Sequence, residues 1–202
     1  VNVNPAYKAS ELKYALKQSE ISLLIMSKGF RQNNYIEILN EIRPSCIHLK
    51  QIVVIEHDWD SLLEAGKKVS DEKLNELEES LQFDEPINIQ YTSGTTGFPK
   101  GVVLTHHNLL NNALAAAKAM KFTRWDKLAV PIPFYHCFGM VVSNLMCFSV
   151  GATVVIPGEY FRPEEVLFAI ESEKCTAVHG VPTMFVAELE HKDFHNFDLN
   201  SL

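Results

Sequence analysis

The chain has 202 residues, of which 47% are hydrophobic and 21% charged, and a net charge of −7 at pH 7. This composition is typical of an ordinary globular protein with one sizeable core, and no basic cluster indicates a nucleic-acid partner. The acidity is local, because residues 56–85 contain 11 acidic and 3 basic residues. Leu74, Leu77 and Leu81 form a sparse apolar stripe there, which predicts a solvated surface helix; a partner-binding acidic face is the weaker alternative.

Helices and strands alternate along the first part of the sequence. We expect a helix capped by Ser10, a buried strand at 21–26, a helix ended by Pro44 and a strand at 52–55. The apolar positions assigned to the two helices are Leu12, Ala15 and Leu16, then Ile36, Leu39 and Ile42. This alternation predicts an α/β fold of mostly parallel sheets with helices on both faces.

Residues 91–101 read YTSGTTGFPKG and have the chemistry of an anion-binding loop. Gly94 and Gly97 allow positive φ angles, which turn backbone N–H groups toward a common point. Lys100 adds a compact positive charge suited to phosphate oxygens. The hydroxyl donors on the same loop are Ser93, Thr95 and Thr96. The pattern therefore predicts a polyphosphate ligand.

Strands are expected on both sides of this loop. Ile87, Ile89 and Tyr91 alternate with polar residues and predict a strand with one buried face, and the β-branched run 101–105 predicts a second strand. A Walker loop requires a different glycine and lysine spacing that leads into a helix. The loop is therefore not of the Walker type.

TSGTTGFPKG resembles the phosphate loop of the adenylate-forming (AMP-binding) superfamily, which includes acyl-CoA synthetases, firefly luciferase and peptide-synthetase adenylation domains. Two further runs are similar to motifs of this superfamily. IPFYHCFG at 132–139 resembles the PxFHxxG segment beside the carboxylate substrate, and HGVPTMF at 179–185 resembles a segment bordering the acyl tunnel. A Ser/Thr/Gly turn without a ligand is the weaker reading of the loop.

The resemblance implies a function and a place within a larger enzyme. Residues 1–202 are expected to form part of the large N-terminal domain of an AMP-forming acyl-CoA synthetase that uses ATP, Mg²⁺ and coenzyme A. A fatty acid of medium chain length is the expected substrate, and the 202-residue chain alone is expected to be inactive. The alternatives are adenylation of an aryl or amino acid for a carrier protein, and a non-catalytic nucleotide-binding module.

The resemblance also assigns roles to individual residues. Lys100 and His136 are the expected catalytic residues, and Thr92 is the expected metal ligand. The residues expected to bind ATP are Thr92, Ser93, Gly94, Thr95, Thr96, Gly97, Phe98, Pro99 and Lys100. Those expected to line the substrate pocket are Tyr135, His136, His179, Gly180, Val181 and Thr183, with plain packing as the rival role for the last four.

Residues 128–158 contain no Asp, Glu, Lys or Arg. Pro131, Pro133 and Gly151 interrupt this stretch, so we expect a buried helix at 138–150 and a strand at 152–156 rather than a membrane span. A helix from Pro163, a strand at 176–181 and a helix from Pro182 are expected to follow.

The four cysteines have no metal-ligand spacing and lie in or beside apolar runs, which favours reduced, buried thiols. We therefore expect a reducing compartment, either the cytoplasm or, in a eukaryote, the mitochondrial matrix. The sequence leaves a homo-oligomer open.

Overall fold

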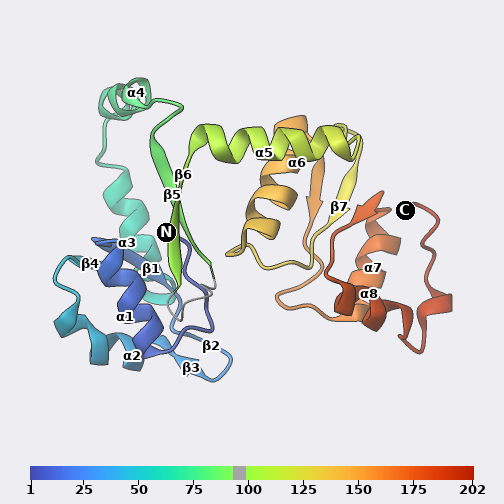
Figure 1. Ribbon diagram of the computed structural model, residues 1–202, viewed down its shortest axis with the longest axis horizontal. Helices are drawn as coiled ribbons and strands as arrows, with labels where there is room; N and C mark the ends of the chain where they lie inside the picture. The colour runs from blue at the N-terminus through green and yellow to red at the C-terminus, as the bar shows by residue number, and fades with distance from the viewer. Residues whose placement is uncertain (93–98) are drawn as a thin grey trace. The chain divides into compact units, whose positions relative to one another are not determined.

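Helices and strands alternate along most of the chain in the computed structural model, which describes residues 1–92 and 99–202 (Figure 1). The chain divides into two compact units, Val1–Thr105 and His106–Leu202. The first contains α1 (Ala9–Gln18), β1 (Leu23–Met26), β2 (Gly29–Phe30), β3 (Asn33–Asn34), α2 (Tyr35–Ile42), η1 (Arg43–Ser45), β4 (Gln51–Val54), α3 (Ile55–Gly66), α4 (Asp71–Ser80), β5 (Pro86–Thr92) and β6 (Lys100–Thr105). The second contains α5 (His106–Ala119), β7 (Lys127–Ala129), η2 (Phe138–Leu145), α6 (Met146–Val150), β8 (Thr153–Val155), α7 (Pro163–Glu173), β9 (Ala177–Val178), α8 (Pro182–Leu189) and η3 (Phe194–Asn196).

Most strand pairings are parallel. β1 runs parallel to β4, and β7 lies between β8 and β9 with both pairings parallel. The pairs β2–β3 and β5–β6 are antiparallel hairpins. Parallel neighbours need a crossover connection, usually a helix, and α2 and α7 lie in such connections. The predicted α/β class with mostly parallel sheets is confirmed.

The core of the first unit is built mainly by α1 and α2. Leu12, Ala15 and Leu16 are buried on α1, as the helical spacing predicts. Side chains from α2 and the segment after it complete one cluster, whose buried members are Leu12, Leu16, Leu39, Ile42, Cys46 and Leu49. The apolar stripes of the two helices therefore meet each other, as the pattern predicts.

The predicted start of α1 is wrong. The helix begins at Ala9, so Ser10 lies inside it instead of capping it. The backbone N–H of Lys8, the residue before the helix, donates to Glu11 Oε2 at 2.7 Å. A carboxylate three residues into the helix thus takes the place of the predicted hydroxyl cap.

β1 is shorter and less buried than predicted. The expected strand at 21–26 is reduced to Leu23–Met26, and Leu23 and Ile25 are 43% and 47% exposed. Only Leu24 and Met26 pack on the core cluster. β1 therefore buries one face, because the helical core covers only that side in the described residues.

The predicted buried face of β5 is also wrong at one position. Ile87 is 43% exposed, whereas Gln90 on the opposite face is 5% exposed. The N-terminal segment runs beside this strand, since Asn2 forms a parallel bridge with Gln90 and the N–H of Asn2 donates to the carbonyl of Ile89 at 3.3 Å. A contact so distant in sequence leaves no mark on the local pattern.

The acidic segment is a solvated surface element, as predicted. It folds as α3 and α4, and neither helix has a buried residue. Leu74 and Leu77 are 48% and 60% exposed, and Leu81 lies just beyond the end of α4.

The charge-free stretch forms helical structure followed by a strand. The predicted helix at 138–150 is divided into the π-helix η2 and the short α-helix α6, and Gly151 ends it at φ +77°. The strand is β8, and none of the helices in the described residues has the length and apolar character needed to cross a membrane. The membrane reading of this stretch is therefore not supported.

The last part of the chain follows the prediction with one shortened element. α7 starts at Pro163 and buries Val166, Leu167 and Ile170. The strand expected at 176–181 is only Ala177–Val178. All four cysteines are free thiols; Cys46, Cys147 and Cys175 are buried, as predicted, whereas Cys137 is only half-buried.

Candidate active site

The hairpin β5–β6 carries the ends of the predicted phosphate loop. Tyr91 pairs with Gly101 and Thr92 with Lys100 in an antiparallel register. The two expected strands are therefore present, and the loop is held at both ends by the ladder. Residues 93–98, which include Ser93, Gly94, Thr95, Thr96, Gly97 and Phe98, lie outside the described part of the chain.

Thr92 and Lys100 face each other across the mouth of this hairpin. The Thr92 hydroxyl donates to the carbonyl of Lys100 at 3.5 Å, and both residues are exposed. Within residues 1–92 and 99–202, the Lys100 ammonium has no carboxylate partner. Its charge is therefore available to an anion at the loop.

Tyr91 ties the hairpin to the core of the first unit. Its hydroxyl donates to the carbonyl of Ala15 on α1 at 3.3 Å, and its ring meets Tyr14 edge to face at 6.4 Å. Burial raises the pKa of the Tyr91 phenol. The strand that enters the phosphate loop is thus anchored one residue before Thr92.

Thr92 suits the predicted metal role chemically. Mg²⁺ prefers oxygen ligands, usually keeps several waters and is commonly bound together with substrate phosphates, so one protein hydroxyl beside a phosphate loop is an adequate contribution. Residues 1–92 and 99–202 contain no cluster of three His, Cys, Asp or Glu side chains that could hold a metal alone.

In the second unit, the segment before η2 turns sharply around His136. Backbone N–H of Phe138 donates to His136 Nδ1 at 3.1 Å, and the N–H of Met140 donates to the His136 carbonyl at 2.9 Å. Because Nδ1 accepts, the neutral ring carries its proton on Nε2. The exposed His136 thus offers an Nε2–H donor.

Gly139 lets this turn close. A Cβ at this position would lie 2.4 Å from the carbonyl oxygen of Pro133. Only glycine fits so close an approach of two backbones. The glycine of the IPFYHCFG run therefore sets the path of the chain past Tyr135 and His136.

His179 lies immediately after β9 and joins this segment. Its Nδ1 is 2.9 Å from the Ser143 hydroxyl on η2, and its ring is 5.2 Å from the Phe138 ring. Burial lowers the pKa of His179. The structure therefore brings two separate predicted runs, 132–139 and 179–185, to one place.

The remaining predicted pocket residues form the turn into α8. A Cβ on Gly180 would lie 2.9 Å from the end of the Phe185 ring, so the glycine leaves room for that ring. The Val181 carbonyl accepts from the N–H of Met184 at 2.8 Å, and the side chains of Val181 and Thr183 are exposed. Gly180 and Val181 therefore lie with His179 in the short connection from β9 to α8, and Thr183 lies in the first turn of α8.

The sequence does not predict the burial of two polar residues in the second unit. Ser143 is fully buried on η2, and Glu188 on α8 is 5% exposed. Burial raises the pKa of Glu188 to about 7, and its Oε1 has no hydrogen-bond partner among the described residues. Neither residue belongs to a recognisable motif, although a glutamate beside Met184 and Phe185 in a helix is a signal of partial burial.

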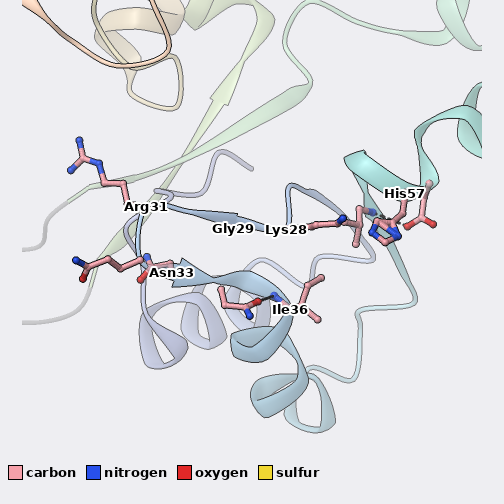
Figure 2. Close-up of a pocket in the computed structure, with 10 residues that line it drawn as sticks. Lys28, Gly29, Arg31, Asn33, Ile36 and His57 are labelled. Carbon is pink, nitrogen blue, oxygen red and sulfur yellow. Dashed lines mark hydrogen bonds between the residues drawn. The ribbon is translucent and has the colours of Figure 1, made fainter.

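A separate cavity lies in the first unit (Figure 2). Its volume is about 700 Å³, and Lys28 and His57 lie at one end with Arg31 and Asn33 at the other (Figure 2). Glu56 accepts two hydrogen bonds from the backbone N–H of Lys28, each 3.1 Å long. None of the predicted motif residues within 1–92 and 99–202 lines this cavity.

Comparison with known proteins decides the family. The sequence profile of the AMP-binding enzyme family matches residues 1–202. The chain belongs to the AMP-binding enzyme family. The recognition made from the phosphate loop is thereby confirmed, and the curated relatives of this AMP-binding chain include several acyl-CoA synthetases and ligases.

Three relatives illustrate the match. The putative acyl-CoA synthetase YngI of Bacillus subtilis is 45% identical over 222 residues, covering 100% of this chain and 40% of YngI. The mitochondrial medium-chain acyl-CoA ligase ACSF2 of Danio rerio is 34% identical, covering 100% of this chain and 37% of ACSF2. The crystal structure of the anthranilate CoA ligase AuaEII with anthranoyl-AMP has a TM-score of 0.74 and 25% identity, covering 99% of this AMP-binding chain and 37% of AuaEII. The chain thus spans about two fifths of these relatives.

Proposed function

We propose that this AMP-binding chain is the nucleotide- and acid-binding part of an AMP-forming fatty acid–coenzyme A ligase. The observation that carries the proposal is the run TSGTTGFPKG, whose ends are fixed by the antiparallel hairpin β5–β6. The acyl-CoA synthetase relatives support the reaction type. We further propose that residues 1–202 belong to the large N-terminal domain of that enzyme.

The reaction has two steps. A carboxylate oxygen of the acid attacks the α-phosphorus of ATP, the bond to the β-phosphate breaks, and acyl-adenylate and pyrophosphate form. The thiol of coenzyme A, losing its proton, then attacks the acyl carbon and AMP leaves. An in-line phosphorus transfer needs mainly positioning and charge neutralisation from the protein.

Residues of the hairpin mouth are assigned to the nucleotide. Lys100 neutralises phosphate charge, and backbone N–H groups of the glycine-rich loop donate to the β- and γ-phosphates. The Thr92 hydroxyl would be a ligand of the magnesium ion that accompanies ATP. The other nucleotide-binding residues proposed are Ser93, Gly94, Thr95, Thr96, Gly97, Phe98 and Pro99.

Residues of the second unit are assigned to the acid. The Nε2–H of His136 is suited to donate to the carboxylate. Beside it, the strand end after β9 supplies a surface for the acyl chain, since ligands of open α/β sheets lie at the carboxyl ends of strands. The other residues proposed to line the pocket are Tyr135, His179, Gly180, Val181 and Thr183.

A medium acyl chain is the proposed substrate length, supported by the similarity to ACSF2. The free buried cysteines support a reducing compartment, the cytoplasm or the mitochondrial matrix. An aryl acid is the alternative that the similarity to AuaEII favours.

ATP–pyrophosphate exchange tests the proposal on the full-length protein containing this chain. We expect exchange that depends on a straight-chain acid and is fastest at intermediate lengths. Lys100→Ala should lower it by about one to three orders of magnitude, as for loss of one charged transition-state contact. Lys50→Ala, which removes another exposed lysine of the same unit, is the matched control and should leave it unchanged. No exchange with any straight-chain, aryl or amino acid would favour a non-catalytic nucleotide-binding module.

A further inference from the structure

Ser143 and His179 form a buried polar pair between η2 and the end of β9. Ser143 is fully buried and His179 is 9% exposed. The pair lies beneath the Phe138 ring, which is tilted by 37° against the imidazole. Burying a polar side chain costs free energy unless its hydrogen bonds are satisfied. Each hydrogen bond of the pair therefore needs one donor and one acceptor.

The single hydroxyl proton of Ser143 decides those directions. Ser143 Oγ is 3.0 Å from the carbonyl oxygen of Phe138 and 2.9 Å from His179 Nδ1. A carbonyl can only accept, so the hydroxyl must donate to Phe138 for that contact to be a hydrogen bond. The same hydroxyl then accepts from His179, which places the imidazole proton on Nδ1. The opposite assignment would leave two unprotonated oxygens facing each other at 3.0 Å.

This assignment leaves His179 Nε2 as a hydrogen-bond acceptor. Burial lowers the pKa of His179, so the ring is neutral near pH 7 and Nε2 carries a lone pair. Among the described residues Nε2 has no partner, yet it is not one of the unpartnered atoms sealed in the interior. Because the outward directions of the two ring nitrogens diverge widely, Nε2 points away from Ser143 and keeps an accessible surface.

We infer that Ser143 fixes His179 as the Nδ1–H tautomer, so that Nε2 recognises an acid whose acyl chain carries a hydrogen-bond donor, such as a hydroxyl group. This inference rests on the proposed function, because only there does His179 line the acyl pocket. His136 and His179 then have opposite roles. His136 presents an N–H donor suited to a carboxylate, and His179 presents an acceptor that a plain alkyl chain leaves unpaired. A site with a polar group discriminates against a substrate lacking the matching one.

Nuclear magnetic resonance of the ¹⁵N-histidine-labelled chain tests the tautomer. Long-range ¹H–¹⁵N correlations should show His179, assigned by its loss in His179→Gln, with a protonated Nδ1 and an unprotonated Nε2. Ser143→Ala should shift the population toward Nε2–H. Ser149→Ala is the matched control, because it removes a hydroxyl that donates to the carbonyl of Met146. An Nε2–H form in the wild type, or a spectrum unchanged by Ser143→Ala, would overturn the inference.

Acid selectivity of the full-length protein tests the substrate class. The measured quantity is the ratio of kcat/KM for hydroxylated acids to kcat/KM for plain acids of the same length. At the best hydroxyl position we expect this ratio to fall about three- to tenfold in His179→Phe, as for one neutral hydrogen bond, and to be unchanged in Ser149→Ala. A purely structural role of His179 would lower kcat/KM equally for the hydroxylated and the plain acid. The ratio would then stay constant, and that result would overturn the substrate claim. Absence of exchange with every acid would instead contradict the proposed function, while the tautomer is still decided by the magnetic resonance spectrum.

Discussion

Glu188 is the one acidic side chain that residues 1–92 and 99–202 bury. Its ordinary pKa is 4.5, and burial raises it to about 7. Below pH 4.5 the carboxyl is protonated in both the folded and the unfolded chain, so it does not affect stability. As the pH rises toward 7, the unfolded chain loses the proton first, and the free energy of unfolding falls.

The charge-removing variant Glu188→Gln should therefore stabilise the protein only at high pH. At about 1.4 kcal/mol per pKa unit, the stabilisation above pH 7 is on the order of 3 kcal/mol, falling to about zero near pH 4. Urea unfolding at pH 4.5 and pH 8 measures the difference. Glu190→Gln, which makes the same change at an exposed glutamate two residues further along the chain, is the matched control. Equal stabilisation at both pH values would show that Glu188 is not the titrating group.

At the scale of the element, η2 is a π-helix where the pattern predicts a plain helix. π-Helical turns are rare and concentrate at functional sites. The wider turn is what lets the Ser143 hydroxyl reach the carbonyl of Phe138, five residues earlier. The start of η2 depends on Gly139, whose missing Cβ accommodates the Pro133 carbonyl.

Gly139→Ala should therefore destabilise the second unit. The added methyl would meet backbone oxygen at 2.4 Å, and overpacking of this kind typically costs about 1 to 3 kcal/mol. Thermal unfolding of the variant and the wild type measures the loss. In Gly66→Ala, the control at the end of α3, the methyl meets no atom within 4 Å, and no comparable loss is expected. A Gly139→Ala protein as stable as wild type would contradict the close approach.

Local patterns predict the elements that depend on nearby residues. The apolar spacing of Leu12 and Leu16 predicts the buried face of α1, and the proline at position 163 predicts the start of α7, because these features are set within a few residues. Apart from the start of α1, where the local Lys8–Glu11 hydrogen bond replaces the predicted cap, two of the unpredicted features involve distant contacts. Gln90 pairs with Asn2 at the start of the chain, and the Ser143 hydroxyl meets His179 only when the end of β9 is folded beside η2. The family is predicted by the letters of residues 92–101 alone, whereas the hydrogen bonds of His136 and His179 exist only in the folded chain.

At the scale of the whole molecule, each unit has a core of its own. Cys46 belongs to the cluster of the first unit, and Cys175 belongs to a cluster with Ala129, Val166 and Ile170 in the second. Burial raises the pKa of the Cys147 thiol to about 11 and also raises that of Cys175, so both thiols are unreactive while folded.

Thiol labelling across a urea gradient should therefore report two unfolding events. We expect Cys147 and Cys175 to become reactive at one common midpoint and Cys46 at a different one, since separate cores unfold as separate cooperative units. Mass spectrometry of the labelled peptides gives the three midpoints. The half-buried Cys137 is the internal control and should react earliest. A single midpoint for all three buried thiols would show that the chain unfolds as one unit.

The most direct test of the proposed chemistry follows oxygen from the acid into AMP. The full-length protein is incubated with ATP, coenzyme A and a fatty acid whose carboxylate oxygens are both ¹⁸O. If a carboxylate oxygen attacks the α-phosphorus and the thiol then cleaves the acyl–oxygen bond, the AMP released must carry a single ¹⁸O, which mass spectrometry detects. Unlabelled AMP, or ADP as the product, would contradict an acyl-adenylate intermediate and with it the function proposed for this chain.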